Sequence, residues 1–138
     1  MALDPSLSGR TFPPTSPYVV SHEKIAEFTQ AIGAVPFENG ETAPPTFPIV
    51  VAFAAMTALM NDPELGIELH RVVHGDQRFE QSRPIRAGDE LVATLTIDTL
   101  RAAAGMDMIG TRTEVATTSG EPVVTAYATL VHRAGGDA

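Results

Sequence analysis

The run IVVAFAAMTALM, residues 49–60, is apolar apart from Thr57 and lies between two stretches that contain proline. Pro48 stands directly before the run, at the first position of a helix, where its missing N–H is not needed. Asn61-Asp62-Pro63 follows the run, and proline disfavours helical geometry in the residue before it. These signals predict a helix from Pro48 to about Met60. Because the helix is apolar on every side, we expect it to be buried all round, with the rest of the chain wrapped around it.

The second half of the chain, from His70 onward, has the composition of β-strands. Val, Thr and Ile are enriched, and from Leu91 to Ile97 an apolar set of residues alternates with a more polar set, as on a half-buried strand. The extended segments are expected at residues 71–85, 89–103, 106–118 and 122–133. Turns at Arg86-Ala87-Gly88, Ala104-Gly105 and Ser119-Gly120 separate them, so the economical pairing is an antiparallel meander.

The first part of the chain adds an arm, a short strand and a second helix. Residues 1–17 are rich in Pro, Ser and Thr and predict an arm laid over the surface. Residues 18–20 are expected to form a short strand. Ser21 is suited to be the N-cap of an amphipathic helix that ends near Ile32.

A long antiparallel sheet that curls around one wholly apolar helix is the hot-dog fold, an α+β architecture. We therefore expect a single hot-dog domain over residues 1–138, with residues 1–17 as its N-terminal arm. A single sheet cannot cover its own edges or the helix ends. Such a domain is expected to pair, with a sheet that is continuous across the dimer.

Composition and charge argue against several classes of function. A formal net charge of -8 with a single lysine, Lys24, argues against sequence-independent binding to nucleic acid, which needs clustered Lys and Arg. No apolar run reaches the roughly 20 residues that span a bilayer, and no leader pattern opens the chain, so we expect a cytoplasmic protein without a membrane contact. The sequence has no cysteine, no Gly-rich phosphate loop and no metal-ligand spacing, so neither a cofactor nor a metal is expected. An acidic partner such as an acyl carrier protein would need a local basic patch, for which Arg83 with Arg86 is the one tight candidate.

The loop AIGAVPFENGETAPPTF, residues 31–47, separates the two expected helices and is the most site-like segment of the chain. It contains no His, Asp, Cys, Ser, Lys or Arg. Glu38 and Glu41 are its ionisable side chains, and together with Asp76 they are the nearby carboxylates that could serve as an acid or a base. The loop therefore offers little for catalysis.

The histidines are weak candidates for a catalytic base. His22 and His132 are expected at the surface, and His70 is expected at the edge of a loop. His74 lies two residues before Asp76 on one strand face, and an imidazole near a carboxylate can act as a base. Such pairs are common on strands without a function, so cross-strand packing is the favoured interpretation of His74.

The segment HGDQRFEQSRPIRAGDEL, residues 74–91, resembles the strand-and-turn signature of MaoC-like hydratases and dehydratases, in which a strand ends in Arg-Pro-(apolar)-Arg-x-Gly-Asp. Residues 9–33, the APPTF at 43–47 and the VVTAYATLVHR at 123–133 are similar to one branch of that family. The branch consists of small actinobacterial proteins that resemble the non-catalytic subunits of heterodimeric (3R)-hydroxyacyl-ACP dehydratases. The similarity runs over nearly the whole chain.

The resemblance also implies that a catalytic dyad is missing. Catalytic members carry Gly-Asp-x-Asn-Pro-x-His in the loop after the first helix, where the aspartate and the histidine handle the proton and the water. Here that place begins Ile32-Gly33-Ala34, with Ala34 where the aspartate is expected, so no catalytic residue is carried over to this chain. In catalytic relatives the N–H groups at the start of the long helix polarise the thioester carbonyl, and here Phe47, Ile49 and Val50 would present them.

The resemblance predicts a subunit of a (3R)-3-hydroxyacyl-thioester dehydratase, reversible as an enoyl hydratase, in fatty-acid elongation. Its expected ligand is an acyl-ACP or acyl-CoA thioester, and its expected partner is a catalytic MaoC-like subunit or a second copy of itself. The apolar helix is expected to line an acyl channel, because each buried methylene contributes roughly 0.8 kcal/mol. The predicted channel and its thioester end comprise Phe37, Phe47, Val51, Phe53, Met56, Arg83 and Arg86. Two alternatives stay open: a non-enzymatic acyl-CoA or acyl-ACP binding module, and a hot-dog thioesterase in which a carboxylate activates water.

Overall fold

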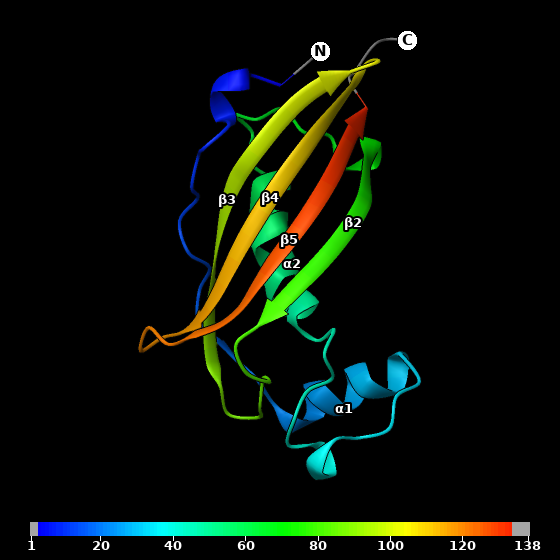
Figure 1. Ribbon diagram of the computed structural model, residues 1–138, viewed down its shortest axis with the longest axis vertical. Helices are drawn as coiled ribbons and strands as arrows, with labels where there is room; N and C mark the ends of the chain where they lie inside the picture. Colours follow the sequence, from blue (N-terminus) through cyan, green and yellow to red (C-terminus); the bar gives the residue numbers. More distant parts are fainter. Residues whose placement is uncertain (1–2, 134–138) are drawn as a thin grey trace.

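The computed structural model describes residues 3–133, and an antiparallel sheet of five strands runs through most of them (Figure 1). The strands are β1 (Tyr18–Val19), β2 (Val72–Gln81), β3 (Glu90–Ala103), β4 (Met106–Thr117) and β5 (Pro122–Arg133), in the spatial order β1-β3-β4-β5-β2. The predicted meander is right for β3, β4 and β5 but wrong for β2, which pairs with β5 at the far edge. Residues 82–89 do not form a hairpin, because Ile85 is buried and its carbonyl accepts a bond from Ala43 N–H. This bond ties the connection to the loop before the long helix.

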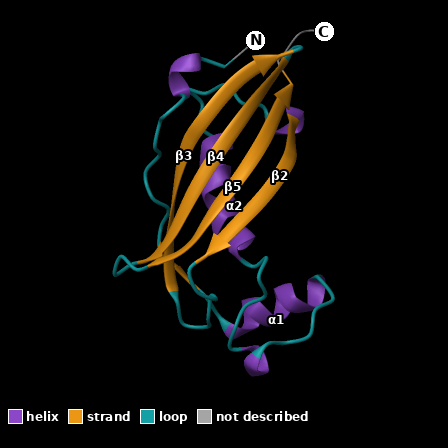
Figure 2. Ribbon diagram, in the orientation of Figure 1, coloured by secondary structure: helices purple, strands orange, loops and turns teal. Residues whose placement is uncertain are grey.

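The helix predicted from the apolar run is present as α2 (Pro48–Met60), with the expected bounds. The sheet curls around it, and α2 packs against β3, β4 and β5 (Figure 2). The expectation of burial on every side is wrong for the single chain, because Phe53 is 50% exposed and Ala54 and Ala58 are exposed as well. One curled sheet reaches around only part of a helix, which leaves these three residues as a solvent-facing α2 stripe. No helix among the described residues is long and apolar enough to cross a membrane.

The N-terminal arm lies along the outer edge of β3, as Figure 1 shows in blue. Backbone bonds join Gly9 N–H to Ile97 O at 2.7 Å and Phe12 N–H to Leu95 O at 2.9 Å. The arm also buries apolar side chains, including those of Leu3, Leu7 and Phe12. One edge of the sheet is therefore covered by the chain itself. The outer edge of β2, by contrast, pairs with no strand among residues 3–133.

The first helix, α1 (His22–Ala31), begins where its cap predicts. The Ser21 side chain accepts a hydrogen bond from Lys24 N–H at 3.0 Å. The helix stands beyond the end of the sheet (Figure 1) and is joined to α2 through the rings of Phe28 and Phe47, which meet edge to face at 5.4 Å. Much of its surface is therefore left uncovered.

Two bulges fall in one row across the sheet. The pairing register shifts after His74 on β2 and again before Thr99 on β3. Asp76 pairs with Thr129, Thr129 pairs with Gly110, and Gly110 pairs with Thr99, so the two shifts are neighbours across the strands. Bulges bend a strand and increase its twist. The row thus marks a line along which the sheet bends.

Candidate functional site

The backbone N–H groups in the first turn of α2 are already in use. Each donates to a carbonyl three residues earlier: Phe47 to Pro44 at 2.9 Å, Ile49 to Thr46 at 3.2 Å and Val50 to Phe47 at 2.9 Å. Pro48 has no N–H. The donors that the resemblance assigns to a thioester carbonyl are therefore occupied within the chain, and a ligand oxygen would have to compete for them.

Two open hollows flank the start of α2 and meet at Ile49. The α1–α2 hollow, of about 440 Å³, is lined by the apolar side chains of Phe28, Ala31, Ile49, Val50 and Phe53, with Lys24 and Glu27 beside them. The β2–α2 hollow, of about 520 Å³, is lined by Thr46, Ile49, His74, Asp76, Gln77 and Phe79. An apolar surface thus lies around Ile49 on the α1 side of the first turn, whereas the β2 side carries polar side chains as well.

The predicted channel residues fall into three environments. Phe47, Val51 and Met56 lie in the core and are at most 2% exposed. Phe53 lines the α1–α2 hollow, whereas Phe37 lies on the loop and is 45% exposed. A role for these residues in lining a channel stays a prediction.

The sequence did not single out the other side chains around Ile49. Phe28 and Ala31 join this surface because α1 docks onto the start of α2, and helical periodicity alone does not reveal that docking. The spacing of Ile25, Phe28 and Ile32 was the available signal. It indicated only that one face of α1 is apolar.

His74 and Asp76 both border the β2–α2 hollow, but they do not share a strand face. The bulge at Gly75 places His74 opposite Leu130 and Asp76 opposite Thr129. Because adjacent residues of a strand point to opposite faces, the bulge turns the two side chains to opposite sides of the sheet. The expected pairing on one face is therefore wrong, and His74 Nε2 lies 2.9 Å from Gln77 Oε1 instead.

The two carboxylates of the loop are engaged close to α1. Glu41 Oε2 lies 2.7 Å from His22 Nε2, and Glu38 accepts a hydrogen bond from the Thr42 hydroxyl. Neither glutamate lines one of the two hollows beside α2. The arrangement gives no support to either one as a base at the start of the helix.

Ala34, in the place of the missing aspartate, lies on a separate side of α1. Its N–H donates to Thr29 O at 3.0 Å, and Gly33 before it adopts a φ of +71°. Ala34 borders a third hollow, of about 590 Å³, which lies between α1 and the loop and is also lined by Ile25 and Pro36. A methyl group at this position can pack but cannot transfer a proton.

Arg83 and Arg86 hold the connection between β2 and β3. Arg83 donates to Asp89 at 2.9 Å and to Glu121 at 3.0 Å, and the backbone N–H of Arg86 donates to Asp89 at 2.8 Å. The bonds that Arg83 donates to Asp89 and Glu121 raise its pKa. Burial would raise the pKa of Asp89, but the bonds from Arg83 and Arg86 and their charges outweigh it, so that pKa is lowered. An acidic partner would have to compete with two carboxylates for Arg83.

His132 is buried, and the expectation that it lies at the surface is wrong. It is 2% exposed and pairs across the sheet with Asp107, which is 1% exposed, with 3.7 Å between Nδ1 and Oδ2. His132 Nε2 accepts a hydrogen bond from Glu68 N–H at 3.2 Å, and Asp107 accepts one from Leu3 N–H at 3.2 Å. The signal was present in the sequence, because His132 alternates with Val131 and shares a strand face with the buried Leu130.

Comparison with known proteins places this geometry in a family. The family model described as "FAS1-like, dehydratase domain region" matches residues 6–126. A UPF0336 protein of Streptomyces coelicolor is 47% identical over the full length of both chains. A UPF0336 protein of Streptomyces avermitilis is 45% identical over 97% of each chain.

Solved structures share the fold. A C-terminally truncated HadBC (3R-hydroxyacyl-ACP dehydratase) complex from Mycobacterium tuberculosis matches with a TM-score of 0.79 and 27% identity, over 91% of this chain and 96% of that chain. A MaoC-like dehydratase matches with a TM-score of 0.77 and 27% identity, over 94% of this chain and 43% of that chain. These matches confirm the predicted α+β hot-dog architecture. The chain belongs to the FAS1-like dehydratase-domain family, within the MaoC-like hot-dog proteins.

Proposed function

We propose that this chain is the substrate-holding subunit of a (3R)-3-hydroxyacyl-thioester dehydratase that also runs as an enoyl hydratase. In the dehydration a base removes a proton from Cα, an acid protonates the leaving hydroxyl on Cβ, and water departs. A partner subunit would supply the aspartate and the histidine for these steps. This chain, acting as one hot-dog domain over residues 1–138, would hold the acyl chain during fatty-acid elongation in the cytoplasm.

The observation that carries the proposal is the apolar surface around Ile49. General acid–base catalysis needs a titratable group within hydrogen-bond reach of the proton that moves. At the loop position of the missing aspartate stands Ala34, and the N–H groups of the first helical turn are occupied. Such a surface favours binding of a hydrocarbon chain over proton transfer.

The apolar surface gives the proposal a measurable signature in acyl-chain length. Each methylene that leaves water contributes roughly 0.8 kcal/mol, so affinity should rise about tenfold for every two methylenes that fit the hollow. Short acyl groups such as crotonyl would reach little of this surface. Long acyl groups should therefore be the preferred substrates of the assembled enzyme.

The need for a partner is supported by two uncovered features. The outer edge of β2 is unpaired among residues 3–133, and the α2 stripe is exposed. The similar HadBC structure is itself a complex of different subunits. We therefore propose that a MaoC-like catalytic subunit, or a second copy of this chain, pairs with β2.

A second candidate function keeps the chemistry in this chain. His74 and Asp76 line the β2–α2 hollow together with Thr46 and Ile49 at the start of α2. His74 would then act as the base of a hydratase, or Asp76 would activate water in a thioesterase. The contact of His74 with Gln77 would have to open for either reaction.

The test measures hydration of enoyl-CoA thioesters, from crotonyl to hexadecenoyl, by this chain together with a MaoC-like subunit that retains the Asp/His motif. We expect kcat/KM to rise with chain length only when this chain is present. Ala31→Trp should fill the α1–α2 hollow and abolish the gain for long substrates. Ala26→Trp is the matched control, because Ala26 is on the same helix but lines the hollow under the loop.

The outcomes separate the two candidates. A rate that does not depend on chain length, or an Ala31→Trp variant that processes long substrates normally, would contradict the substrate-holding role. High activity of this chain alone that is lost in His74→Ala would establish the second candidate. Hydrolysis of saturated acyl-CoA that is lost in Asp76→Asn would identify a thioesterase.

A further inference from the structure

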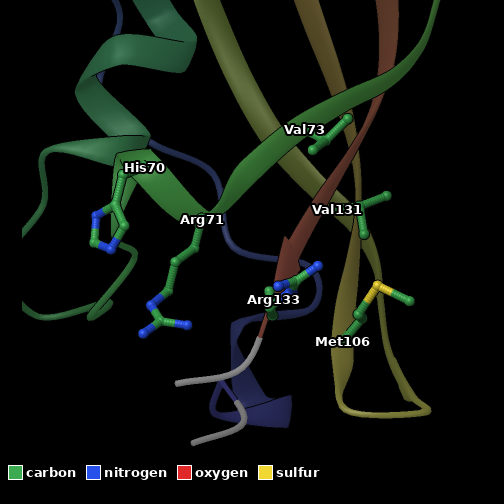
Figure 3. A pocket seen from close by; sticks show the side chains of 6 residues that line it. All are labelled: His70, Arg71, Val73, Met106, Val131 and Arg133. Atoms are coloured by element: carbon green, nitrogen blue, oxygen red, sulfur yellow. The ribbon is translucent and has the colours of Figure 1, made fainter. Parts of the chain in front are cut away.

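A hollow lined by basic and apolar side chains lies where β2 begins and β5 ends (Figure 3). Its volume is about 410 Å³, and its lining consists of His70, Arg71, Val73, Met106, Val131 and Arg133. The first two residues belong to the short helix η3 (Leu69–Arg71). We call this feature the basic hollow, and neither the family match nor the surface around Ile49 accounts for it.

The basic hollow has the make-up of an interaction surface. Val73 is 65% exposed, Met106 is 40% exposed, and Leu69 beside them is 61% exposed. Strand pairing adds Arg101, which lies across β4 in the same row as Val131 and Val73. Exposed apolar side chains surrounded by charged ones are typical of protein interfaces.

The charge of the hollow is opposite to that of the molecule. The chain carries a formal net charge of -8, yet two of its eight arginines line the hollow and a third, Arg101, lies nearby on β3. None of the ion pairs within residues 3–133 involves Arg101 or Arg133. Arg83, the arginine favoured by the sequence, is held by two carboxylates instead. The basic hollow is therefore the better site for an acidic partner.

A buried histidine holds this surface in place. His132 lies inside the sheet at the end of β5, and its Nε2 accepts the backbone N–H of Glu68 at 3.2 Å. The Glu68 carboxylate lies 2.6 Å from Arg71 Nε. Glu68 therefore connects Arg71, through its side chain, to His132 on β5, through its backbone N–H. A preformed surface loses little conformational entropy when a partner binds.

We infer that the basic hollow is the docking surface for the acidic helix of an acyl carrier protein. The inference rests on the proposed function, which makes a carrier-bound thioester the substrate. The apolar side chains would receive the apolar residues of that helix, while Arg101 and Arg133 would meet its carboxylates. Attraction between opposite charges would also speed the encounter of two molecules that are otherwise both acidic.

The position of the hollow implies that a carrier protein docked there would deliver its acyl group to the other subunit. The end of β2 adjoins the start of α2, because Gln81 Nε2 donates to Pro45 O at 2.8 Å. β2 has ten residues and spans roughly 34 Å, so the hollow lies far from the α2 start of its own chain. Antiparallel pairing of two β2 edges would bring the start of one strand beside the end of the other. The hollow would then lie level with the partner's α2 start along the strands, on the outer face of the shared sheet.

The same pairing leaves the hollow open to a third protein. Val131 lies next to the buried Leu130 on β5, so Val131 and its neighbour Val73 point away from the core and from α2. Edge pairing extends a sheet sideways and does not cover its outer face. A second copy would therefore leave these apolar side chains exposed.

The experiment measures binding of a phosphopantetheinylated bacterial acyl carrier protein, without an acyl group, to the full-length chain. Titrations of the ¹⁵N-labelled carrier are followed by NMR at low and at physiological ionic strength. Arg101→Glu and Arg133→Glu should each weaken binding about fivefold and flatten its salt dependence. Arg10→Glu carries the same charge change on the N-terminal arm, outside the basic hollow, and should bind as the original chain does. Arg133→Gln removes the charge without reversing it, so its affinity should be intermediate. Unchanged thermal unfolding verifies that the variants are folded.

Several results would overturn the docking surface. One is binding by the Arg101 and Arg133 variants that equals binding by the original chain. Another is an equal loss of binding in Arg10→Glu. A third is a fall of the Arg101 and Arg133 variants to monomer mass, which would assign the hollow to contact between copies. Free coenzyme A that binds through the same arginines as tightly as the carrier would assign it to the nucleotide. Enoyl-CoA substrates contain no carrier protein. The dependence of kcat/KM on their chain length therefore tests the proposed function separately. If kcat/KM rises with acyl-chain length but the chain binds no carrier protein, the docking surface is contradicted and the proposed function is not.

Discussion

Asp89 joins three parts of the chain through one carboxylate and one carbonyl. Its side chain accepts from Arg83 and from Arg86 N–H, and its carbonyl accepts from Val20 N–H at 2.8 Å. Asp89→Asn removes the charge while keeping the shape, and we expect it to lower the free energy of unfolding by about 1 to 2 kcal/mol at neutral pH. Urea titration followed by circular dichroism measures this difference.

The pH dependence of that loss has a definite sign. The pKa of Asp89 is lowered in the folded chain, so its contribution is present above the ordinary carboxyl pKa of about 4 and is lost as the pH falls through the lowered pKa. The original chain and Asp89→Asn should therefore differ at pH 7 and converge once the pH has fallen below the lowered pKa of Asp89. Glu64→Gln, which changes a carboxylate that is 79% exposed, should show neither effect. A difference that persists unchanged in acid would contradict the role of the ionised pair.

His132 should hold its proton on one nitrogen. Because Nε2 accepts from Glu68 N–H, the neutral ring must carry its hydrogen on Nδ1, which faces Asp107. ¹⁵N-resolved NMR of the imidazole rings at pH 8 should show this tautomer for His132. The exposed His74, whose Nε2 lies 2.9 Å from Gln77 Oε1, serves as the comparison. A proton found on Nε2 of His132 would contradict the bond that anchors η3.

The bend of the sheet depends on a glycine in β4. A Cβ added to Gly110 would overlap the hydroxyl of Thr99 on β3. We expect Gly110→Ala to destabilise the chain by about 1 to 2 kcal/mol, because the threonine must rotate or the strands must separate. Thr99→Ala should restore most of this loss in the double variant, as measured by thermal unfolding. If Thr99→Ala fails to rescue Gly110→Ala, the close approach is not the cause.

Elements that are specified locally could be predicted from the sequence, and long-range pairings could not. Pro48 and the Asn-Asp-Pro stretch at 61–63 fixed both ends of α2, and Ser21 fixed the start of α1. The placement of β2 beside β5 depends on how residues 82–89 pack on the loop before α2, which no local pattern encodes. The bulge at Gly75 likewise could not be predicted, and it places His74 and Asp76 on different faces of the strand.

The same limit applied to the candidate site. The absence of histidine and aspartate from the loop at 31–47 is a property of the sequence and could be stated directly. The apolar surface around Ile49 required the docking of α1 on α2, and the basic hollow required the pairing of β4, β5 and β2. Residues such as Arg71 and Arg133 are far apart in the chain. Only the fold brings them together.

At the scale of the whole molecule, the uncovered surfaces adjoin one another. Ile49 lies one helical turn before Phe53 of the α2 stripe and borders β2 in the β2–α2 hollow, so this residue connects the stripe to the open strand edge. An exposed apolar helix face next to an unpaired strand favours association, because one partner can satisfy the backbone groups and bury the side chains together. Stable interfaces bury about 1,200 Å² or more, which a paired strand and a helix face together can supply.

We therefore expect the purified chain to be a dimer at micromolar concentration, as measured by light scattering coupled to size-exclusion chromatography. Phe53→Glu places a charge on the α2 stripe and should weaken dimerisation at least about tenfold, because a buried unpaired charge opposes association. Val35→Glu is the control, because Val35 is 79% exposed on the loop and lines neither hollow beside α2. A chain that stays monomeric under these conditions would contradict self-association. If it then formed a one-to-one complex with a catalytic MaoC-like subunit, and Phe53→Glu abolished that complex, the same surface would serve a heterodimer.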